Sequence, residues 1–289
     1  MQALHDFTSG SKKNLLKKGL ESSDVFSIFY HNIFEYPLTF SELAKWTSKN
    51  PPDISAKVGY KNGYYFVDGS AGLIYKRAIR HRFSQKKIKI AEKAAKFLSL
   101  IPAIKMIGLS GSVAMDNAER GSDIDLIIIT KKGSLWTTRM IVYMMLNLLG
   151  YRLRIPRNLK QKDRLCLNIW LDESDLKWGN RERNLYTAHE ILQIIPLINK
   201  KHTFERFLIE NIWALDYWPN AVDKKRIIKI NTSYTKLRNL NLIEQIAYKI
   251  QYFYMKDKIT REVINPTRAI FHPNNLSKDI LGKLAIDKQ

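Results

Sequence analysis

Two aspartates separated by one residue, Asp123 and Asp125, are the side chains of this sequence best suited to chemistry. They begin an apolar stretch, residues 123–130, that predicts a β-strand. Because side chains alternate between the two faces of a strand, both carboxylates point the same way, about 7 Å apart along the chain. Carboxylate oxygens are the ligands that hard cations prefer. The pair is therefore predicted to bind a divalent metal ion, Mg²⁺ or Mn²⁺.

A glycine and a serine, Gly111 and Ser112, precede this pair by ten intervening residues. They form a predicted turn between an apolar strand, residues 104–109, and a short helical segment. The free N–H groups and the positive dipole end at the start of a helix suit a phosphate. Gly111 lets the backbone approach an anion closely, and the Ser112 hydroxyl can donate to a phosphate oxygen. Turn and aspartates together predict a site for a nucleoside triphosphate.

The elements that must position these residues are strands alternating with helices. The apolar periodicity predicts a helix over 73–101 capped afresh at Ser84, strands over 104–109, 123–130, 151–155 and 165–171, and a helix over 134–149. From residue 180 onward we expect helices over 183–195, 204–217 and 240–258, then turns and a short closing helix. The pattern indicates a small mixed sheet backed by helices.

The N-terminal part has a different pattern. A helix over 24–34 is followed by a capping box of Thr39 and Glu42, and Asn62-Gly63 predicts a β-hairpin. This order is typical of a winged-helix module. Residues 50–57 contain two prolines and are too few for a recognition helix, which favours packing or dimerisation over DNA reading. The predicted domains are a basic arm (1–20), a winged-helix-like module (21–80), a core (81–178) and a helical C-terminal region (179–289).

The formal net charge of +21 and pI of about 9.8 favour a polyanionic partner such as RNA or DNA. A lysine-rich proteome is the alternative explanation. Eight cations between Lys76 and Lys93, called here the basic track, form either a nucleic-acid surface or a solvated helix face; they are Lys76, Arg77, Arg80, Arg82, Lys86, Lys87, Lys89 and Lys93. A single cysteine, Cys166, excludes an internal disulfide and favours a reducing cytoplasm. The longest apolar run is too short to span a membrane, and no secretory leader is seen, so we expect no membrane partner.

Gly111-Ser112, ten intervening residues and Asp123-Ile124-Asp125, placed between two apolar strands, resemble the signature of nucleotidyltransferases of the DNA polymerase beta superfamily. More loosely, the chain resembles a prokaryotic group with a winged-helix-like front module; the matching pieces are Ile33 to Thr39, Leu165 to Asn168, Ala188-His189-Glu190 and Phe271-His272-Pro273. The resemblance implies an α+β fold, with a small mixed-sheet core, flanking helices and a helical C-terminal region. It also implies magnesium-dependent transfer of a nucleoside monophosphate from a triphosphate to a hydroxyl, with release of pyrophosphate.

The acceptor of that transfer stays open: a nucleic-acid end, a protein or a small molecule. A non-catalytic nucleotide-sensing or nucleic-acid-binding regulatory protein is the alternative function. Many members of the superfamily use a third carboxylate on a neighbouring strand as ligand and base. Here the mid-strand residue is Asn168, an amide that cannot act as a base, so we expect Asp172, or else Glu173, in that role. Arg120 and Ser122, in the loop before the aspartates, are further candidates for nucleotide binding, although a solvated loop arginine is the alternative for Arg120.

Overall fold

The computed structural model describes residues 20–49, 57–155, 161–224, 227, 240–259, 262–271 and 276–285. The predicted basic arm, up to residue 19, and the proline-containing segment 50–56 lie outside the described residues. Among the described helices, none combines the length and the apolar character that crossing a bilayer requires.

The front of the chain folds as the sequence predicts, helix by helix. Its elements are α2 (Ser22–Asn32), β1 (Leu38–Thr39), α3 (Phe40–Lys45), β2 (Val58–Lys61) and β3 (Tyr64–Val67), and the strands form a sheet in the order β1-β3-β2. Thr39 and Glu42 make the predicted capping box at the start of α3. Asn62 and Gly63 both have positive φ angles, as a tight hairpin turn requires. The helix, helix, hairpin order is therefore present, while its assignment as a winged helix stays a prediction.

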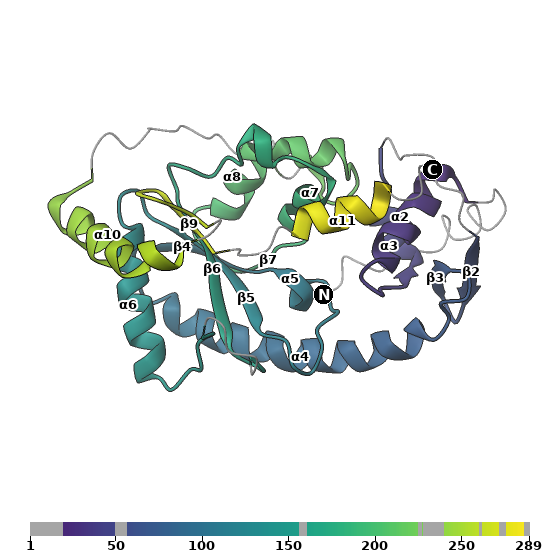
Figure 1. The fold of residues 1–289 in the computed structure, drawn as a ribbon, viewed down its shortest axis with the longest axis horizontal. Coiled ribbons are helices and arrows are strands. Elements are labelled where there is room, and N and C mark those ends of the chain that lie inside the picture. The colour runs from purple at the N-terminus through teal and green to yellow at the C-terminus, as the bar shows by residue number, and fades with distance from the viewer. Residues whose placement is uncertain are drawn as a thin grey trace.

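The core is a six-stranded mixed sheet with the strand order β7-β4-β5-β6-β9-β8. Its strands are β4 (Ile104–Leu109), β5 (Ile124–Thr130), β6 (Leu165–Asp172), β7 (Ile195–Asn199), β8 (Val263–Asn265) and β9 (Arg268–Ile270). The central neighbours β5 and β6 run parallel, and every other pair is antiparallel. The predicted α+β class, with a small mixed sheet flanked by helices, is confirmed (Figure 1).

Three of these strands lie where the sequence predicted helix or turns. The helix expected over 183–195 ends early as α7 (Leu185–Leu192), and β7 then pairs with β4. Pro196 is tolerated there because β7 is an edge strand. β8 and β9 form a hairpin within the predicted closing turns, and β9 pairs with β6. The expectation of helix alone between residues 180 and 258 was therefore wrong at β7, because long-range pairing overrides local pattern.

The helices differ from expectation in smaller ways. α4 (Leu73–Leu98) is continuous, so the cap predicted at Ser84 is wrong: its buried hydroxyl accepts a hydrogen bond from the N–H of Ala118 at 2.9 Å. The strand expected over 151–155 is reduced to one bridge between Leu153 and Leu165. The remaining helices are α5 (Gly111–Ala114), α6 (Leu135–Leu148), α8 (Thr203–Glu210), α10 (Leu242–Met255) and α11 (Leu276–Ala285), with short 3-10 turns η1 (Asn180–Glu182), η2 (Ile212–Asp216) and η3 (Lys256–Lys258).

The sheet separates two apolar layers. Leu126 and Ile128 of β5 face the layer that includes buried residues of α4 and α6. Ile127 and Ile129 face the other layer, which includes residues of α7, η2 and the front module. In Figure 1, α4 runs along one side of the molecule, and α7, α8 and α11 lie on the other. By the alternation of strand faces, Asp123 and Asp125 belong to the face of Ile127.

Candidate active site at the start of strand β5

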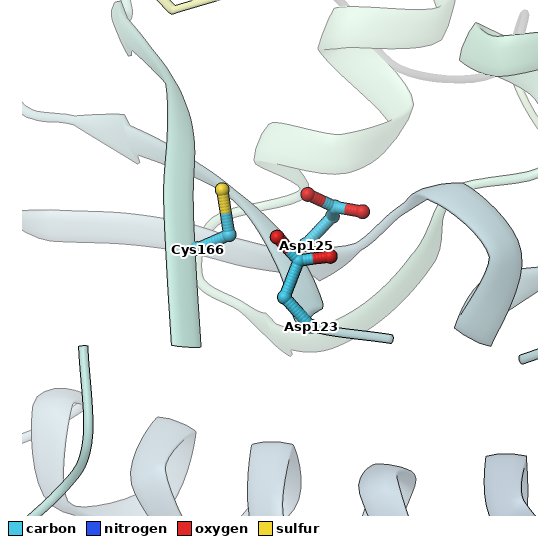
Figure 2. A group of neighbouring side chains, drawn as sticks. All are labelled: Asp123, Asp125 and Cys166. Carbon is cyan, nitrogen blue, oxygen red and sulfur yellow. The ribbon is translucent and has the colours of Figure 1, made fainter. Parts of the chain in front are cut away.

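The two predicted aspartates and one cysteine meet at the beginning of β5. One ligand atom from each of Asp123, Asp125 and Cys166 lies within 4.8 Å of the others, and Figure 2 shows the three side chains close together. The register explains the meeting, because Asp125 pairs with Cys166 across the parallel strands β5 and β6. The cluster has the residue types and the spacing of a divalent cation site.

A β-bulge brings an amide into the same cluster. Asp125 pairs with Cys166 but Ile127 pairs with Ile169, so β6 carries one extra residue at this point. Asn168 occupies the bulge, and its Nδ2 donates a hydrogen bond to Oδ1 of Asp125 at 2.9 Å. Its Oδ1 is buried and finds no partner among the described residues. The neighbouring-strand position is therefore filled by an amide whose free oxygen lies beside the carboxylates.

The glycine turn lies directly against Asp125. A Cβ atom at residue 111 would lie only 2.6 Å from Oδ2 of Asp125, and Gly111 has a φ of +62°. A side chain there would be both strained and in collision with the carboxylate. The N–H of the preceding Ser110 donates to the carbonyl of Asp125 at 3.0 Å, and α5 begins at Gly111 with Ser112 as its second residue. The sequence requirement for glycine thus comes from close approach to the acidic pair.

Burial and mutual repulsion make the acidic pair electrostatically unfavourable without a cation. Burial, and then the charge of Asp123, raise the pKa of Asp125 to about 7. Arg154 partly compensates, since its Nη1 lies 3.2 Å from Oδ2 of Asp123. Burial also raises the pKa of the Cys166 thiol, and the charge of Asp125 raises it further. A divalent cation would relieve this repulsion.

Residues 88–192 match the family model of the nucleotidyltransferase domain. This part of the chain is similar to a nucleotidyltransferase domain. The matched segment runs from within α4 to the end of α7 and includes Gly111, both aspartates and Asn168. The activity of the chain is accordingly that of an enzyme that transfers nucleotidyl groups.

Comparisons with solved structures and with curated proteins found only weak similarity or none. One solved structure, of a toxin-antitoxin with AMP-PNP, shares 18% identity at a TM-score of 0.27 over 42% of this chain and 84% of that chain. A second, of a mutant of the toxin-antitoxin MntA-HpeT, shares 17% identity at a TM-score of 0.25 over 45% of this chain and 84% of that chain. No curated protein matches the chain.

The residue predicted as the third carboxylate of the nucleotidyltransferase domain lies elsewhere. Asp172 pairs with Thr130, at the opposite end of β5 from Asp125. Its Oδ2 accepts from the N–H of Gly133 at 2.6 Å, and its Oδ1 accepts from the N–H and hydroxyl of Ser174. Asp172 therefore caps turns at the C-terminal end of β6, and its assignment to the acidic pair was wrong.

The alternative, Glu173, directly follows the same end of β6. Its Oε1 accepts from the N–H of Lys132 at 3.1 Å, and its Oε2 lies 3.2 Å from Nη2 of Arg206. No carboxylate from the end of β6 therefore reaches the acidic pair.

The loop before the aspartates is organised by a buried lysine. Lys87 of α4 donates from Nζ to the carbonyl of Ser122 at 2.7 Å and pairs with Asp163 at 2.6 Å. The Ser122 hydroxyl accepts from the N–H of Glu119 at 3.0 Å, whereas the Arg120 side chain is exposed. These contacts shape the loop, and the nucleotide-binding roles of Arg120 and Ser122 stay predictions.

The basic track is half neutralised. Four of its members form ion pairs: Lys76 with Glu35, Arg77 with Glu42, Arg80 with Glu35 and Glu119, and Lys87 with Asp163. The other four are exposed and form no ion pair with a described residue; they are Arg82, Lys86, Lys89 and Lys93. Their spacing of four, three and four residues places them on one face of α4. The surface available to a polyanion is therefore smaller than the sequence suggested.

Sequence reasoning missed two neighbours of the acidic pair. Cys166 was considered only for disulfides and zinc, although its position two residues before Asn168 places it on the same strand face. Glu190 of α7 was named only within a resemblance. Burial, and then the charge of Asp125, raise the pKa of Glu190 to about 8. No local pattern signals this proximity, because α7 follows the pair by some sixty residues of sequence.

Proposed function

We propose that the domain transfers a nucleoside monophosphate from a nucleoside triphosphate to an acceptor hydroxyl, with release of pyrophosphate, and that it uses Mg²⁺ or Mn²⁺. The observation that carries the proposal is the contact between the glycine turn and the acidic pair. Because a Cβ at residue 111 would lie only 2.6 Å from Oδ2 of Asp125, the backbone at the start of α5 and this carboxylate share one small space. A phosphate bridging a cation and backbone N–H groups needs such a space.

The donor set fits a divalent metal ion. Asp123 and Asp125 would hold it through carboxylate oxygens, and the unpartnered Oδ1 of Asn168 offers a third oxygen. When bound, such an ion neutralises phosphate charge and activates the acceptor oxygen. For Asn168 to bind the cation through its Oδ1, its amide group would have to rotate, because its Nδ2 donates a hydrogen bond to Asp125.

The remaining residues of the site would bind and orient the triphosphate. The N–H groups at Gly111 and Ser112 would hold a phosphate oxygen at the start of α5, and the Ser112 hydroxyl would donate to it. Arg120 and Ser122 are proposed as further contacts of the triphosphate. In the step itself, the acceptor oxygen forms a bond to the α-phosphorus, the bond from that phosphorus to the bridging oxygen breaks, and pyrophosphate leaves with the electron pair.

To test this proposal, the protein is incubated with an α-³²P nucleoside triphosphate, Mg²⁺ or Mn²⁺, and a panel of RNA, DNA, protein and small-molecule acceptors. The position of the label is then followed. We expect label to appear on one class of acceptor and pyrophosphate to form in equal amount. The Asp123→Asn, Asp125→Asn double variant should lose this transfer. Transfer undiminished in the double variant, or absent from the wild-type protein with every class, would contradict the proposal.

A further inference from the structure

A cavity of about 760 Å³ lies beside the acidic pair, between the sheet and helices α7 and α11. Its wall includes Ser110, Ile127, Ile169, Tyr186, Glu190 and Leu281. The volume falls in the range of about 300 to 1,000 Å³ that is usual for sites of small molecules. None of the site predictions from the sequence uses this space.

Two independent observations show that the cavity lies next to Asp125. Ile127 follows Asp125 by two residues on β5, so the two side chains share a face of the sheet about 7 Å apart. Ser110, which also lines the cavity, donates its N–H to the carbonyl of Asp125 at 3.0 Å. A molecule in this cavity is therefore adjacent to a phosphate held at the acidic pair.

Two polar side chains of α7 face this space together. Tyr186 and Glu190 are four residues apart on the helix, which places them on the same face, and both line the cavity. Their proximity to the acidic pair shows in their electrostatics, because the charge of Asp125 contributes, after burial, to a raised pKa in both. Glu190 accepts a hydrogen bond from Nε2 of Gln193 at 2.6 Å, which holds its carboxyl group in place.

The character of the wall selects the class of molecule. Most of the wall is aliphatic or aromatic, including Trp178 and Ile194. Its two carboxylates, Glu182 and Glu190, are matched in number by two cations, Arg181 and Lys278. A phosphodiester backbone requires a groove with an excess of cations, whereas this mostly apolar hollow has as many carboxylates as cations. The cavity therefore suits an uncharged molecule with an apolar body and leaves its polar group to meet Glu190.

We propose that this cavity, named here the acceptor cavity, binds the acceptor of the transfer reaction, a small uncharged alcohol, and that Glu190 removes the proton of its hydroxyl. The inference rests on the proposed function and names its substrate class. The alcohol oxygen bonds to the α-phosphorus, its proton passes to a carboxylate oxygen of Glu190, and pyrophosphate departs. Glu190 thereby supplies the carboxylate base that Asn168 cannot be.

The first experiment measures transfer of label from α-³²P ATP, with Mg²⁺, to a library of drug-sized alcohols, beside RNA and protein acceptors. We expect saturable transfer to at least one alcohol. Leu281→Trp, which adds bulk at the cavity wall, should raise the KM of that alcohol about tenfold or more while leaving the Kd of a non-hydrolysable ATP analogue unchanged. Leu281→Met, of similar volume, should behave as wild type.

The second experiment addresses the base. Glu190→Gln should lower kcat about 100-fold or more with an unchanged Kd for the ATP analogue, as expected for loss of a general base. It should also remove the acid limb of the pH–rate profile, which a purely structural role would not do. Glu92→Gln, a matched change on the exposed face of α4, should leave rate and profile unaltered.

The outcomes separate this inference from the proposed function. Transfer of label to RNA or protein only, at the same rate in Leu281→Trp as in wild type, would overturn the role of the acceptor cavity and leave nucleotidyl transfer intact. Weakened binding of the ATP analogue by Leu281→Trp also overturns it, because the cavity would then hold the nucleoside. No binding of the analogue by the wild-type protein rejects the proposed function itself.

Discussion

The contact between Gly111 and Asp125 links a backbone requirement to an electrostatic one. A methyl group at residue 111 would meet Oδ2 of Asp125 at 2.6 Å, in a backbone conformation with φ of +62°. We therefore predict that Gly111→Ala lowers stability by about 1–2 kcal/mol and shifts Asp125. Nucleotidyl transfer should fall at least about 100-fold, because a displaced ligand costs both metal and phosphate binding.

The measurement combines urea unfolding with the labelled-nucleotide assay. Gly121→Ala is the matched control, since a Cβ there meets nothing within 4 Å and lies in the same loop region. Equal effects of the two substitutions would contradict the role given to Gly111.

Substitutions of Asn168, on the neighbouring strand β6, test its contact with the acidic pair. Asn168→Asp replaces the donor to Oδ1 of Asp125 with a third buried carboxylate. Without metal, this change should destabilise the fold by about 2–3 kcal/mol through repulsion and the lost hydrogen bond. With Mn²⁺, the variant should gain more in melting temperature than wild type, because binding to the folded state stabilises it in proportion to affinity.

Asn168→Ala serves as control, since it removes the donor without adding charge. The same Mn²⁺-dependent gain in wild type and in Asn168→Asp would show that Asn168 does not face the metal.

At the residue scale, the sequence sufficed for the aspartates and the glycine because these lie close along the chain. Their spacing within one strand and one turn fixes their geometry locally. Asn168 was correctly expected at the neighbouring-strand position, whereas Asp172 was wrongly assigned, because it lies four residues further along β6 and pairs with Thr130. The bulge that accommodates Asn168 arises from pairing between distant segments and has no local signature.

At the scale of elements, α3 and α4 are joined by a buried ion pair. Nη2 of Arg77 lies 2.6 Å from Oε1 of Glu42, and Tyr36 donates to the same oxygen. Burial opposes the charge of Glu42, but the hydrogen bonds and charge of Arg77 prevail and lower the pKa of Glu42 to about 2. Because this pKa lies below its unfolded value of 4.5, the pair stabilises the fold above pH 4.5 and loses that contribution as the pH falls toward 2.

Glu42→Gln should accordingly destabilise the protein by about 2–3 kcal/mol at pH 7. The difference from wild type should shrink between pH 4.5 and 2, as measured by chemical unfolding across that range. Glu35→Gln, which breaks a pair at the surface with Lys76 and Arg80, should cost less than about 1 kcal/mol. A pH-independent difference for Glu42→Gln would contradict the assigned cause.

The elements that the sequence predicted well are those with strong local periodicity, such as β4, β5 and α10. β7 was missed because Pro196 and the apolar residues before it look like the end of a helix. β8 and β9 are short, and only their pairing with β6 identifies them as strands. In each case the missing information was a partner far along the chain.

At the scale of the whole molecule, the net charge of +21 favours a polyanionic partner, although four of the eight cations of the basic track are engaged in ion pairs. The exposed cations of the basic track line one face of α4; they are Arg82, Lys86, Lys89 and Lys93. We predict weak RNA binding whose log K falls linearly with log salt concentration. Reversing these four charges to glutamate should reduce affinity about tenfold or more and flatten the salt slope.

Filter-binding measurements at salt concentrations from about 50 to about 200 mM test this prediction. The Asp123→Asn, Asp125→Asn variant should bind RNA as wild type does. Unchanged affinity after charge reversal would remove α4 as the contact surface.

The proposed function requires Asp123 and Asp125 to hold the metal that binds the triphosphate against the turn at Gly111. A crystal structure with Mn²⁺ and a non-hydrolysable nucleoside triphosphate tests it most directly, through the anomalous signal of manganese. We expect a manganese peak bound by both aspartates, with a phosphate oxygen at the N–H groups of Gly111 and Ser112. Manganese or triphosphate bound elsewhere, with the acidic pair unliganded, would contradict it.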